Sequence, residues 1–503
     1  MNTLHRMVGS LLFFGFCAGS ALADWPTDPA AGLVVGAMEN AFGPRQSIAA
    51  GDDGGVWVAW QDSLCIGSVR LQRIGVDGSL LSADGIDVQE DPTCAFHLPP
   101  VLEAIGDGAV VSRALSGMNL YPVKRVGADG GALWPAGFST DTVRTLGGVA
   151  EFSNGDALIV SNGFGSIHAD RIDEVGNPVW AQQALVIDGI SANLRIIDVI
   201  PMSDGGAVVL WDSHLSYTKL IYAMRIQNDG SPAWTEPVQM VAPPPGTASS
   251  RHSDPVAVSD GQGGVVLLFT HGFEAGTTPA PLLMQRVNAD GSLAFPIEGV
   301  RVSLGSARQF DVIAKTDQTS GDVLVVWRDG QQANTAVRAQ RMSLLGDRLW
   351  GDEGVEVAWL DPLRGSFDSV WKKDKLSVAI GEPGGVVMYE LDGDGQIDAE
   401  PWAVYTGGAA GNVRTVGSGD GVVVSWQDDG FIAAQRLRVD GTLGGESCNA
   451  ADLTQDGELD FFDVSFFLSA FAAMDAVADF NQDGAFDFFD VSEFLAVFAA
   501  GCP

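Results

Sequence analysis

From Phe310 to Ala358 the chain reads FDVIAKTDQTSGDVLVVWRDGQQANTAVRAQRMSLLGDRLWGDEGVEVA, and this stretch decides the fold of the 503 residues. An alternating segment precedes a turn at Asp317. It is followed by the apolar run VLVVW, a second alternating segment that ends at Arg341, a Gly turn at Gly346, and a closing run GVEVAW. Alternating and β-branched runs between Gly-rich turns are typical of consecutive antiparallel strands. The stretch therefore predicts a unit of four strands.

The same unit recurs along the chain, and the Arg of its second alternating segment marks each copy. The marking residues are Arg73, Arg125, Arg171, Arg225, Arg286, Arg341 and Arg436, and Glu390 stands in place of the Arg in one further copy, VVMYELDGDG. Eight copies of about 52 residues are typical of propeller blades, because a lone four-stranded sheet cannot bury its own faces. A β-sandwich needs about twice that length per domain, and β-helix coils need much less. We therefore expect a mainly β protein with an eight-bladed β-propeller.

The two ends of the repeat region complete each other. Gly32-Leu33-Val34-Val35-Gly36 matches the closing strand of the other copies but has no first three strands before it. The eighth copy, from Val413 to Leu443, lacks its closing strand. An N-terminal strand that closes the last blade would leave no exposed sheet edge in the ring.

Two further residue types recur at fixed places in the copies. A Trp ends the second strand of several copies (Trp60, Trp211, Trp327, Trp426), where packing between blades is favoured over a sugar-stacking platform. Acidic residues recur where they can pair with the marking Arg, at Asp53, Asp107, Asp156, Asp204, Asp322 and Asp420. Antiparallel counting puts Arg436 opposite Gly421. A repeated Arg and acid pair is most simply structural.

The N-terminus and the composition predict export. Residues 1–23 have the layout of a secretory signal peptide, with Arg6, an apolar run from Leu11 to Cys17, and Ala21-Leu22-Ala23 before the cleavage point. The chain carries 28 basic and 64 acidic residues, a net charge of −36, which argues against nucleic acid or anionic lipid as partners. The four cysteines of the mature chain group by position as Cys65 with Cys94 and Cys448 with Cys502, which suits two disulfides outside the cell.

The C-terminal tail is acidic and duplicated. The two halves are DLTQDGELDFFDVSFFLSAF and DFNQDGAFDFFDVSEFLAVF. Oxygen ligands at every second position of a twelve-residue loop converge on a hard cation, and the sixth position needs Gly for a sharp turn. The expected ligands are Asp452, Thr454, Asp456, Glu458, Asp460 and Asp463 in the first loop, and Asp479, Asn481, Asp483, Ala485, Asp487 and Asp490 in the second. We therefore expect two bound Ca²⁺ ions, and a helix after each loop because an apolar face recurs there.

A duplicated calcium loop and helix resembles the dockerin family, and the terminal Gly501-Cys502 is similar to a dockerin-like subgroup that ends in Gly-Cys. The resemblance implies a small α-helical domain that docks onto a cohesin-like or other surface receptor. At loop positions 10 and 11 this chain departs from the family's small hydroxylic residues, because it carries Phe461 and Phe462 in the first half and Phe488 and Phe489 in the second. These four side chains are the expected docking surface.

One pair of insertions is the expected place for a ligand on the propeller. The connections Ala242 to Asp254 and Thr270 to Pro281 are longer than their counterparts and are expected at the same face of the ring. Their polar residues are Arg251, His252, Asp254, His271 and Glu274. The plain alternative is a tolerated Pro- and Gly-rich insertion that binds nothing.

The domains and the function follow from these parts. We expect a signal peptide over 1–23, a propeller over 24–446 and a dockerin-like domain over 447–503. No nucleophile elbow, phosphate-binding Gly loop, Cys/His dyad or metal-ligand spacing of histidines appears in the sequence, so no catalytic residue is predicted. The main interpretation is a secreted, surface-associated, non-enzymatic binding or scaffold protein. The alternative is an enzyme or carbohydrate-binding subunit of an extracellular polysaccharide-degrading assembly, for which the propeller ligand is a glycan.

Overall fold

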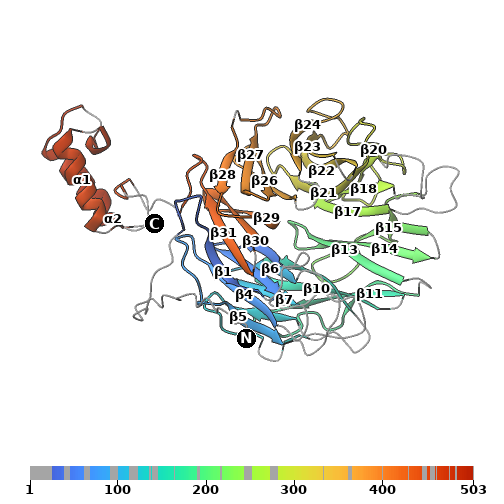
Figure 1. Cartoon of the computed structure of the whole chain (residues 1–503). Coiled ribbons are helices and arrows are strands. Elements are labelled where there is room, and N and C mark those ends of the chain that lie inside the picture. Colours follow the sequence, from blue (N-terminus) through green and yellow to red (C-terminus); the bar gives the residue numbers. More distant parts are fainter. Residues whose placement is uncertain are drawn as a thin grey trace, which may run out of the picture.

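A computed structural model gives the fold of the chain (Figure 1). The structure describes residues 25–38, 46–61, 68–90, 100–112, 123–134, 137–138, 145–163, 165–189, 193–215, 218–242, 252–271, 281–331, 334–360, 365–398, 400–428, 430–444, 450–453, 459, 461–474, 476–481 and 484–501. These residues form seven four-stranded sheets and one three-stranded sheet. They include no helix that is both long enough and apolar enough to span a membrane. The predicted eight-bladed β-propeller is confirmed.

The first four blades follow one another along the chain. Blade one is β2 (Gln46–Ala50), β3 (Val56–Gln61), β4 (Ser68–Ile74) and β5 (Ile86–Glu90). Blade two is β6 (Val101–Ile105), β7 (Gly108–Ser112) and β8 (Lys124–Val126). Blade three is β9 (Thr145–Phe152), β10 (Asp156–Gly163), β11 (Ser166–Ile172) and β12 (Ala184–Ile187), with a 3-10 turn at Ser153–Gly155. Blade four is β13 (Asn193–Pro201), β14 (Ala207–Leu215), β15 (Thr218–Ile226) and β16 (Val238–Gln239).

The other four blades complete the ring. Blade five is β17 (His252–Ser259), β18 (Val265–His271), β19 (Leu282–Val287) and β20 (Val300–Arg301). Blade six is β21 (Gln309–Thr316), β22 (Val323–Gln331), β23 (Asn334–Met342) and β24 (Val355–Leu360). Blade seven is β25 (Ser366–Lys372), β26 (Lys375–Glu382), β27 (Gly385–Leu391) and β28 (Trp402–Tyr405). Blade eight is β29 (Gly411–Ser418), β30 (Gly421–Asp428), β31 (Phe431–Leu437) and, from the other end of the chain, β1 (Leu33–Ala37).

The strand β1 closes the ring as predicted. It pairs antiparallel with β31, with Leu33 opposite Ala434 and Ala37 opposite Phe431. Val35 is fully buried in this position, whereas Val34 is 53% exposed. The alternation of strand side chains therefore places one Val in the seam between blades and its neighbour in solvent.

The first strand of each blade forms the inner wall of the ring. Each of these strands contacts the first strand of the next blade, and the contacts run all the way round, from β2 through β6, β9, β13, β17, β21, β25 and β29 back to β2. Partly exposed side chains on these strands therefore lie around the centre of the propeller.

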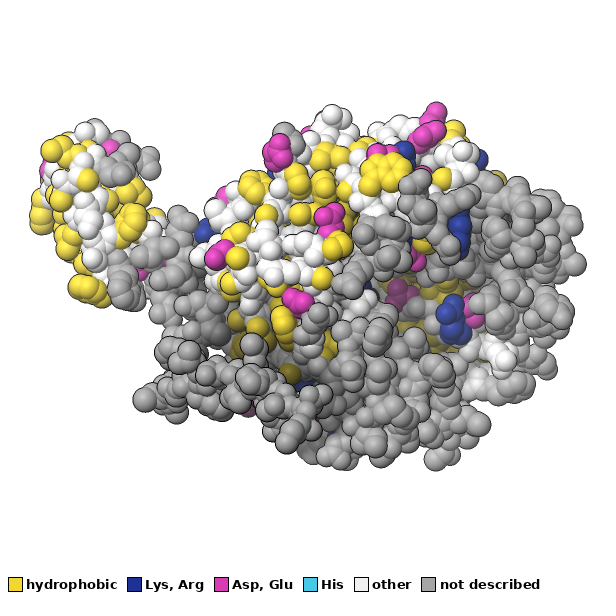
Figure 2. Space-filling view, viewed as in Figure 1, with side chains coloured by type: hydrophobic (Ala, Val, Ile, Leu, Met, Phe, Trp, Pro, Cys, Tyr) yellow, Lys and Arg dark blue, Asp and Glu magenta, His cyan; other side chains and the backbone are white. Residues whose placement is uncertain are grey.

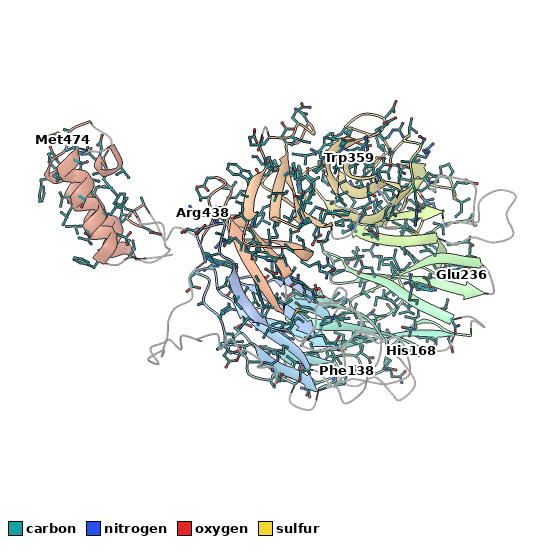
Figure 3. All side chains as sticks on the ribbon, in the orientation of Figure 1. Phe138, His168, Glu236, Trp359, Arg438 and Met474 are labelled. Atoms are coloured by element: carbon teal, nitrogen blue, oxygen red, sulfur yellow. The ribbon has the colours of Figure 1, made fainter. Side chains whose placement is uncertain are left out.

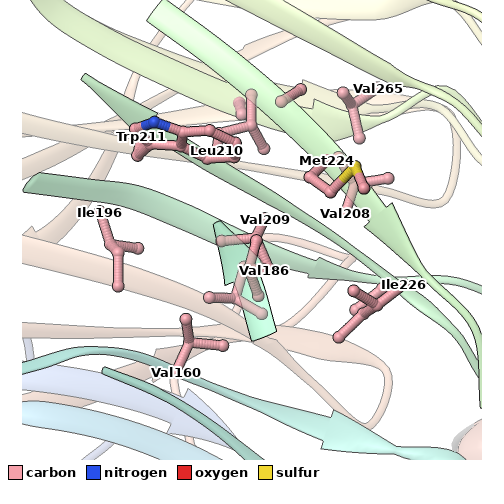
Figure 4. Close-up of a cluster of buried hydrophobic side chains, with 14 of the residues drawn as sticks. Val160, Val186, Ile196, Val208, Val209, Leu210, Trp211, Met224, Ile226 and Val265 are labelled. Carbon is pink, nitrogen blue, oxygen red and sulfur yellow. The ribbon is translucent and has the colours of Figure 1, made fainter. Parts of the chain in front are cut away.

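The core lies between the blades. Trp60, Trp211, Trp327 and Trp426 are fully buried at the ends of second strands, so they are packing residues and the sugar-platform alternative is wrong for them. Figure 4 shows Trp211 in a cluster that joins blades three, four and five, with Val160, Ile196 and Val265 among its members. Each Trp fills the wedge that opens as the blades fan out from the centre.

The marking residues share one register in all eight blades. In each third strand the marking residue pairs with an apolar or small residue of the second strand, from Arg73 opposite Trp57 to Arg436 opposite Val423. The expected partner of Arg436, Gly421, is wrong by two residues because the hairpin turns between Asp428 and Phe431. The guanidinium reaches back along the strand to Asp420, 3.0 Å away.

Most of the predicted Arg and acid pairs are present and structural. Ion pairs join Arg171 to Asp156, Arg225 to Asp204 and Arg341 to Asp322, at 2.6–2.8 Å. Arg73 pairs with Asp53 in the same way. Arg286 uses Asp260, a partner that the sequence did not indicate. The pair of Arg125 and Asp107 is not formed among the described residues, although Arg125 is buried.

At four seams the marking Arg also joins its blade to the next one. Its Nη1 donates to a carbonyl in a turn of the next blade, and the indole Nε1 of a Trp donates to the same carbonyl. The carbonyls are those of Val76, Asn228, Ala289 and Gly393, and they bind Arg436 with Trp25, Arg171 with Trp180, Arg225 with Trp234, and Arg341 with Trp350.

Two helices follow the ring, as expected for the tail, and Figure 1 shows them in red: α1 (Phe461–Ala473) and α2 (Phe488–Ala500). A 3-10 turn at Ala476–Ala478 lies between them. Phe467 and Phe494 stack with ring centroids 4.1 Å apart, and both are 1% exposed. The recurring apolar face thus packs the two halves of the tail against each other. The predicted boundaries between the three parts of the chain stay predictions.

Candidate active site

Three carboxyl groups lie on neighbouring first strands of the inner wall of the ring. Glu103 lies on β6, Glu151 on β9 and Asp198 on β13, the first strands of blades two, three and four. All three side chains are partly exposed. They come from adjacent blades, so three separate strands place them on one sector of the wall.

Short contacts hold these groups in place. The backbone of Glu151 forms a hydrogen bond with the Glu103 carboxylate. In the other direction, the Glu151 Oε1 accepts a hydrogen bond of 3.2 Å from the backbone N–H of Gly106, in the turn after β6. Asp198 Oδ1 accepts from the backbone N–H of Val199 at 2.8 Å. Glu103 and Glu151 are therefore linked through backbone groups of both blades.

The surroundings raise the pKa of two of the three groups. Burial between the blades raises the pKa of Glu103 from 4.5 to about 7, and the charges of Asp198 and Glu151 add to this effect. Burial also raises the pKa of Asp198, from 3.8 to about 6, against a hydrogen bond from the Val199 backbone that lowers it. Both groups keep some access to solvent, because their side chains are only partly buried.

The two raised pKa values define a proton donor and a proton acceptor. Near neutral pH Glu103 keeps much of its proton, while Asp198 is mostly ionised. Carboxyl groups whose surroundings raise their pKa values toward neutral pH supply the general acid and the general base in many hydrolases. Partly exposed carboxyl groups whose pKa values are strongly raised mark a candidate active site.

Glu103 interrupts a row of the repeat that is apolar in six of the eight blades. Its register partner is Val110, which is in turn opposite the marking residue Arg125. In six of the other blades the same place holds an apolar residue: Ala49, Ala150, Ile200, Val258, Val370 and Val416. In blade six it holds Lys315. The repeat did not indicate Glu103, because a repeat identifies residues that recur. This carboxyl is informative because it occurs in one blade alone.

The structure brings together the strand ends that border the two predicted ligand loops of blade five. β17 begins at His252 and β18 ends at His271, and these two residues are directly opposite each other in the strand pairing. The side chains of His252, Asp254 and His271, and the whole of Arg251 and Glu274, lie outside the described residues. A ligand site on these loops stays a prediction.

The second calcium loop has a turn of the expected kind. Gly484, at its sixth position, has φ of 80° and donates its N–H to Asp479 at 2.9 Å. Asp490, at position twelve, is fully buried and accepts backbone N–H groups of Asp487 and Asn481. These hydrogen bonds lower the pKa of Asp490, and the one from the Asp487 backbone has the largest effect. The carboxylate is therefore ionised and available to a cation. Ala485 is exposed. This is compatible with its expected role, because the seventh position of such a loop supplies its backbone carbonyl and not its side chain.

The first calcium loop is described only in part. Asp452 and Asp463 are buried, but Thr454, Asp456, Glu458 and Asp460 lie outside the described residues, as does Asp483 of the second loop. Within the described part of the chain no three acidic or histidine side chains are close enough to hold a metal. The donors that are described fit a hard cation, and calcium stays a prediction.

The expected docking surface is exposed on the helices, as far as it is described. Phe461 and Phe488 are each 75% exposed, and Phe489 is 66% exposed. Figure 2 shows hydrophobic side chains spread over the surface of this part of the molecule. The side chain of Phe462, the signal peptide over 1–23, and Cys65, Cys94, Cys448 and Cys502 lie outside the described residues.

Comparison with known proteins finds matches among solved structures. No family model and no curated protein sequence matches it. Among solved structures it is similar to a polysaccharide lyase, an ulvan lyase bound to a GlcA(1-4)Rha3S unit, with 11% identity over 83% of this chain and 95% of that one and a TM-score of 0.41. An α-L-arabinanase from Penicillium chrysogenum bound to arabinobiose shares 11% identity over 59% and 93%, with a TM-score of 0.34. A protein from Lactobacillus plantarum shares 14% identity over 64% and 90%, with a TM-score of 0.40.

These comparisons correct the main interpretation of the sequence. We expected a non-enzymatic binding or scaffold protein, and the solved structures that carry a functional name, the ulvan lyase and the arabinanase, are enzymes. The absence of a recognisable catalytic motif had favoured the wrong interpretation, because carboxyl pairs assembled from different blades leave no motif in sequence. The alternative is the one that we take forward.

Proposed function

We propose that the chain is an enzyme of an extracellular polysaccharide-degrading assembly, and that the inner wall of its propeller cleaves a glycosidic bond by general acid–base catalysis. The main support for this proposal is the pKa of Glu103, which is raised to about 7 beside Glu151 and Asp198. A carboxylic acid that keeps its proton near neutral pH, beside carboxylates that have lost theirs, is what glycoside hydrolysis requires.

In this reaction each group has one task. Glu103 donates its proton to the oxygen of the leaving sugar as the bond from the anomeric carbon to that oxygen breaks. Asp198, with the lower pKa, takes a proton from the attacking water, whose oxygen forms the new bond to the anomeric carbon. The carboxyl of Glu151 is held by the Gly106 N–H and adds negative charge beside a transition state with positive charge on the sugar ring.

The tail supplies the link to the assembly. Its duplicated loop and helix resembles dockerins, so the second part of the proposal is that two Ca²⁺ ions order the loops and that the helices bind a cohesin-like or other surface receptor. The exposed Phe461, Phe488 and Phe489 offer this receptor apolar contact area. Residues 1–23 direct export, and two disulfides, Cys65 with Cys94 and Cys448 with Cys502, form outside the cell.

The test is a hydrolysis screen of the full chain on neutral and acidic polysaccharides, read as new reducing ends. Glu103→Gln should lower turnover by about 10² to 10⁴, because it removes the proton donor. The matched control is Asp311→Asn, which changes an exposed carboxyl on the first strand of blade six and should leave turnover unchanged. Binding of a polysaccharide without cleavage would restrict the protein to the role of a carbohydrate-binding subunit.

A further inference from the structure

One of the Trp residues that cover the seams is more open to solvent than its counterparts. The ninth position after the marking residue holds a Trp in four copies, at Trp134, Trp180, Trp234 and Trp350. Trp134, Trp234 and Trp350 are 3%, 6% and 7% exposed, whereas Trp180 is partly exposed. The seam between blades three and four therefore presents part of an indole ring to solvent.

The ring of Trp180 is held in a fixed orientation. Its Nε1 donates to the carbonyl of Asn228 at 3.0 Å. A Cβ on Gly230 would lie 3.0–3.2 Å from three atoms of the ring, so the bare Gly backbone lies against one face of the indole. Phe152 contacts the ring at a centroid distance of 6.1 Å and an interplanar angle of 88°. A ring that is fixed in this way loses little freedom when a ligand packs on it.

The remaining surface of Trp180 lines an open hollow at the seam. The hollow has a volume of about 700 Å³, within the range of about 300–1,000 Å³ that is typical of ligand sites. Gln182, in the connection between β11 and β12, lines it from blade three. Asn228 and Asp229, in the connection between β15 and β16, line it from blade four. Both blades therefore contribute side chains to one hollow.

Three polar side chains at the hollow keep hydrogen-bonding capacity. Asn228 Oδ1 accepts from Arg171, but the Asn228 Nδ2 donates to none of the described residues. Asp229 Oδ1 accepts from the backbone N–H and the hydroxyl of Ser231, at 2.9 and 2.6 Å, and its Oδ2 accepts from none of the described residues. Gln182 is exposed and its side chain forms no hydrogen bond within the described part of the chain. The hollow therefore offers donors and acceptors beside an aromatic surface.

The charges at the hollow disfavour an anionic ligand. Among the described residues that line it the only cation is Arg171, which is 8% exposed and whose guanidinium already binds Asp156 and Asn228. Hydrogen bonds from the hydroxyl and the backbone of Ser231 lower the pKa of Asp229, so this exposed carboxylate is ionised. A phosphate, a sulfate or a carboxylate would meet a negative charge and no available cation. A neutral ligand with hydroxyl groups fits these surroundings.

We propose that this hollow binds a neutral sugar residue of a glycan. A pyranose has apolar C–H groups that pack on an aromatic ring, and hydroxyl groups around its rim that both donate and accept hydrogen bonds. The C–H groups lie on the open part of Trp180, one hydroxyl donates to Asp229 Oδ2, and another accepts from Asn228 Nδ2. The Gln182 amide can take either role. The site uses none of the three carboxyl groups of the inner wall, so it does not depend on the proposed function.

The test is calorimetric titration of the full chain with the neutral xylotetraose and cellotetraose, and with tetragalacturonate as the anionic control. We expect saturable binding of at least one neutral oligosaccharide, and weaker binding of tetragalacturonate. Trp180→Ala should weaken binding by about tenfold or more, because it removes the aromatic surface. The matched control is Trp359→Ala, which removes an indole that is 57% exposed on β24 of blade six (Figure 3) and should leave the affinity unchanged.

A second variant guards against a failure of Trp180→Ala to fold. Gln182→Ala removes an exposed side chain that has no partner within the described residues, so it leaves the seam intact and should weaken binding by about three- to fivefold. Equal affinity in the parent, in Trp180→Ala and in Gln182→Ala would overturn the site. Tighter binding of tetragalacturonate than of both neutral oligosaccharides would overturn it too, as would no saturable binding of either neutral one at about 10 mM.

Discussion

At the scale of single residues, the inner wall and the seams use charged groups in opposite ways. Most of the marking Arg residues form ion pairs, and at four seams they also bind the next blade. Glu103 forms no ion pair among the described residues, and burial and two neighbouring carboxylates act on it together. A group that costs stability and faces the centre of the ring is better explained by function than by folding.

This cost predicts how stability changes with pH. In the unfolded chain Glu103 loses its proton near its ordinary pKa of 4.5, but in the folded chain it keeps the proton up to about pH 7. Between these values the unfolded state binds fewer protons, so the free energy of unfolding falls as pH rises through this window. Glu103→Gln removes this pH-dependent loss of stability. Its stability relative to the parent should therefore rise from pH 4.5 to pH 7 and level off above it, as measured by urea denaturation at a series of pH values. A difference that does not change with pH would contradict the raised pKa.

The same contrast shows what the sequence could predict at this scale. Arg341 and Asp322 could be paired from sequence because the same types recur at the same places in other copies. Glu103, Glu151 and Asp198 are almost 50 residues apart from one to the next, and only the packing of neighbouring blades brings them to one part of the wall. The available signal was a single carboxyl in each of three apolar first strands, VLEAI, GGVAEF and IIDVI. That signal is visible once the register of the blades is known.

At the scale of elements, the N-terminal strand β1 carries the closure of the ring. Val35→Ala removes buried methyl groups between blades one and eight and should lower the free energy of unfolding by about 2–3 kcal/mol. Val34→Ala, in the same strand but with its side chain 53% exposed, should change it by less than about 0.5 kcal/mol. Chemical denaturation of the two variants compares them directly, and equal effects would show that β1 does not hold the last blade.

The two loop-helix units of the tail predict a calcium requirement. Acidic side chains that converge in a loop repel one another until a cation binds, so metal binding and folding are coupled. Calorimetry on the full chain should find two Ca²⁺ ions, and chelation should speed hydrogen exchange in α1 and α2. The second site should be the tighter one, because Asn481 is a better oxygen donor than Thr454. No heat of binding at millimolar calcium would rule out both sites.

At the scale of the whole molecule, repetition explains which predictions succeeded. The period, the marking Arg and the incomplete end copies determine the number of blades and the closure by β1, because each blade must bury both faces against its neighbours. The function could not be read in the same way. Eight similar blades give eight similar inner strands, and the proposed active wall depends on single carboxyls in three neighbouring ones.

The most direct test of the account is the pH dependence of kcat/KM on the polysaccharide that the screen identifies, measured for the full chain and for Glu103→Gln. The account predicts a bell-shaped profile with limbs near pH 6 and pH 7, because one group must be ionised and the other protonated. In the variant the alkaline limb should disappear and kcat/KM should fall by about 10² or more. A variant that keeps the activity and the alkaline limb of the parent would contradict the assignment of the inner wall as the active site.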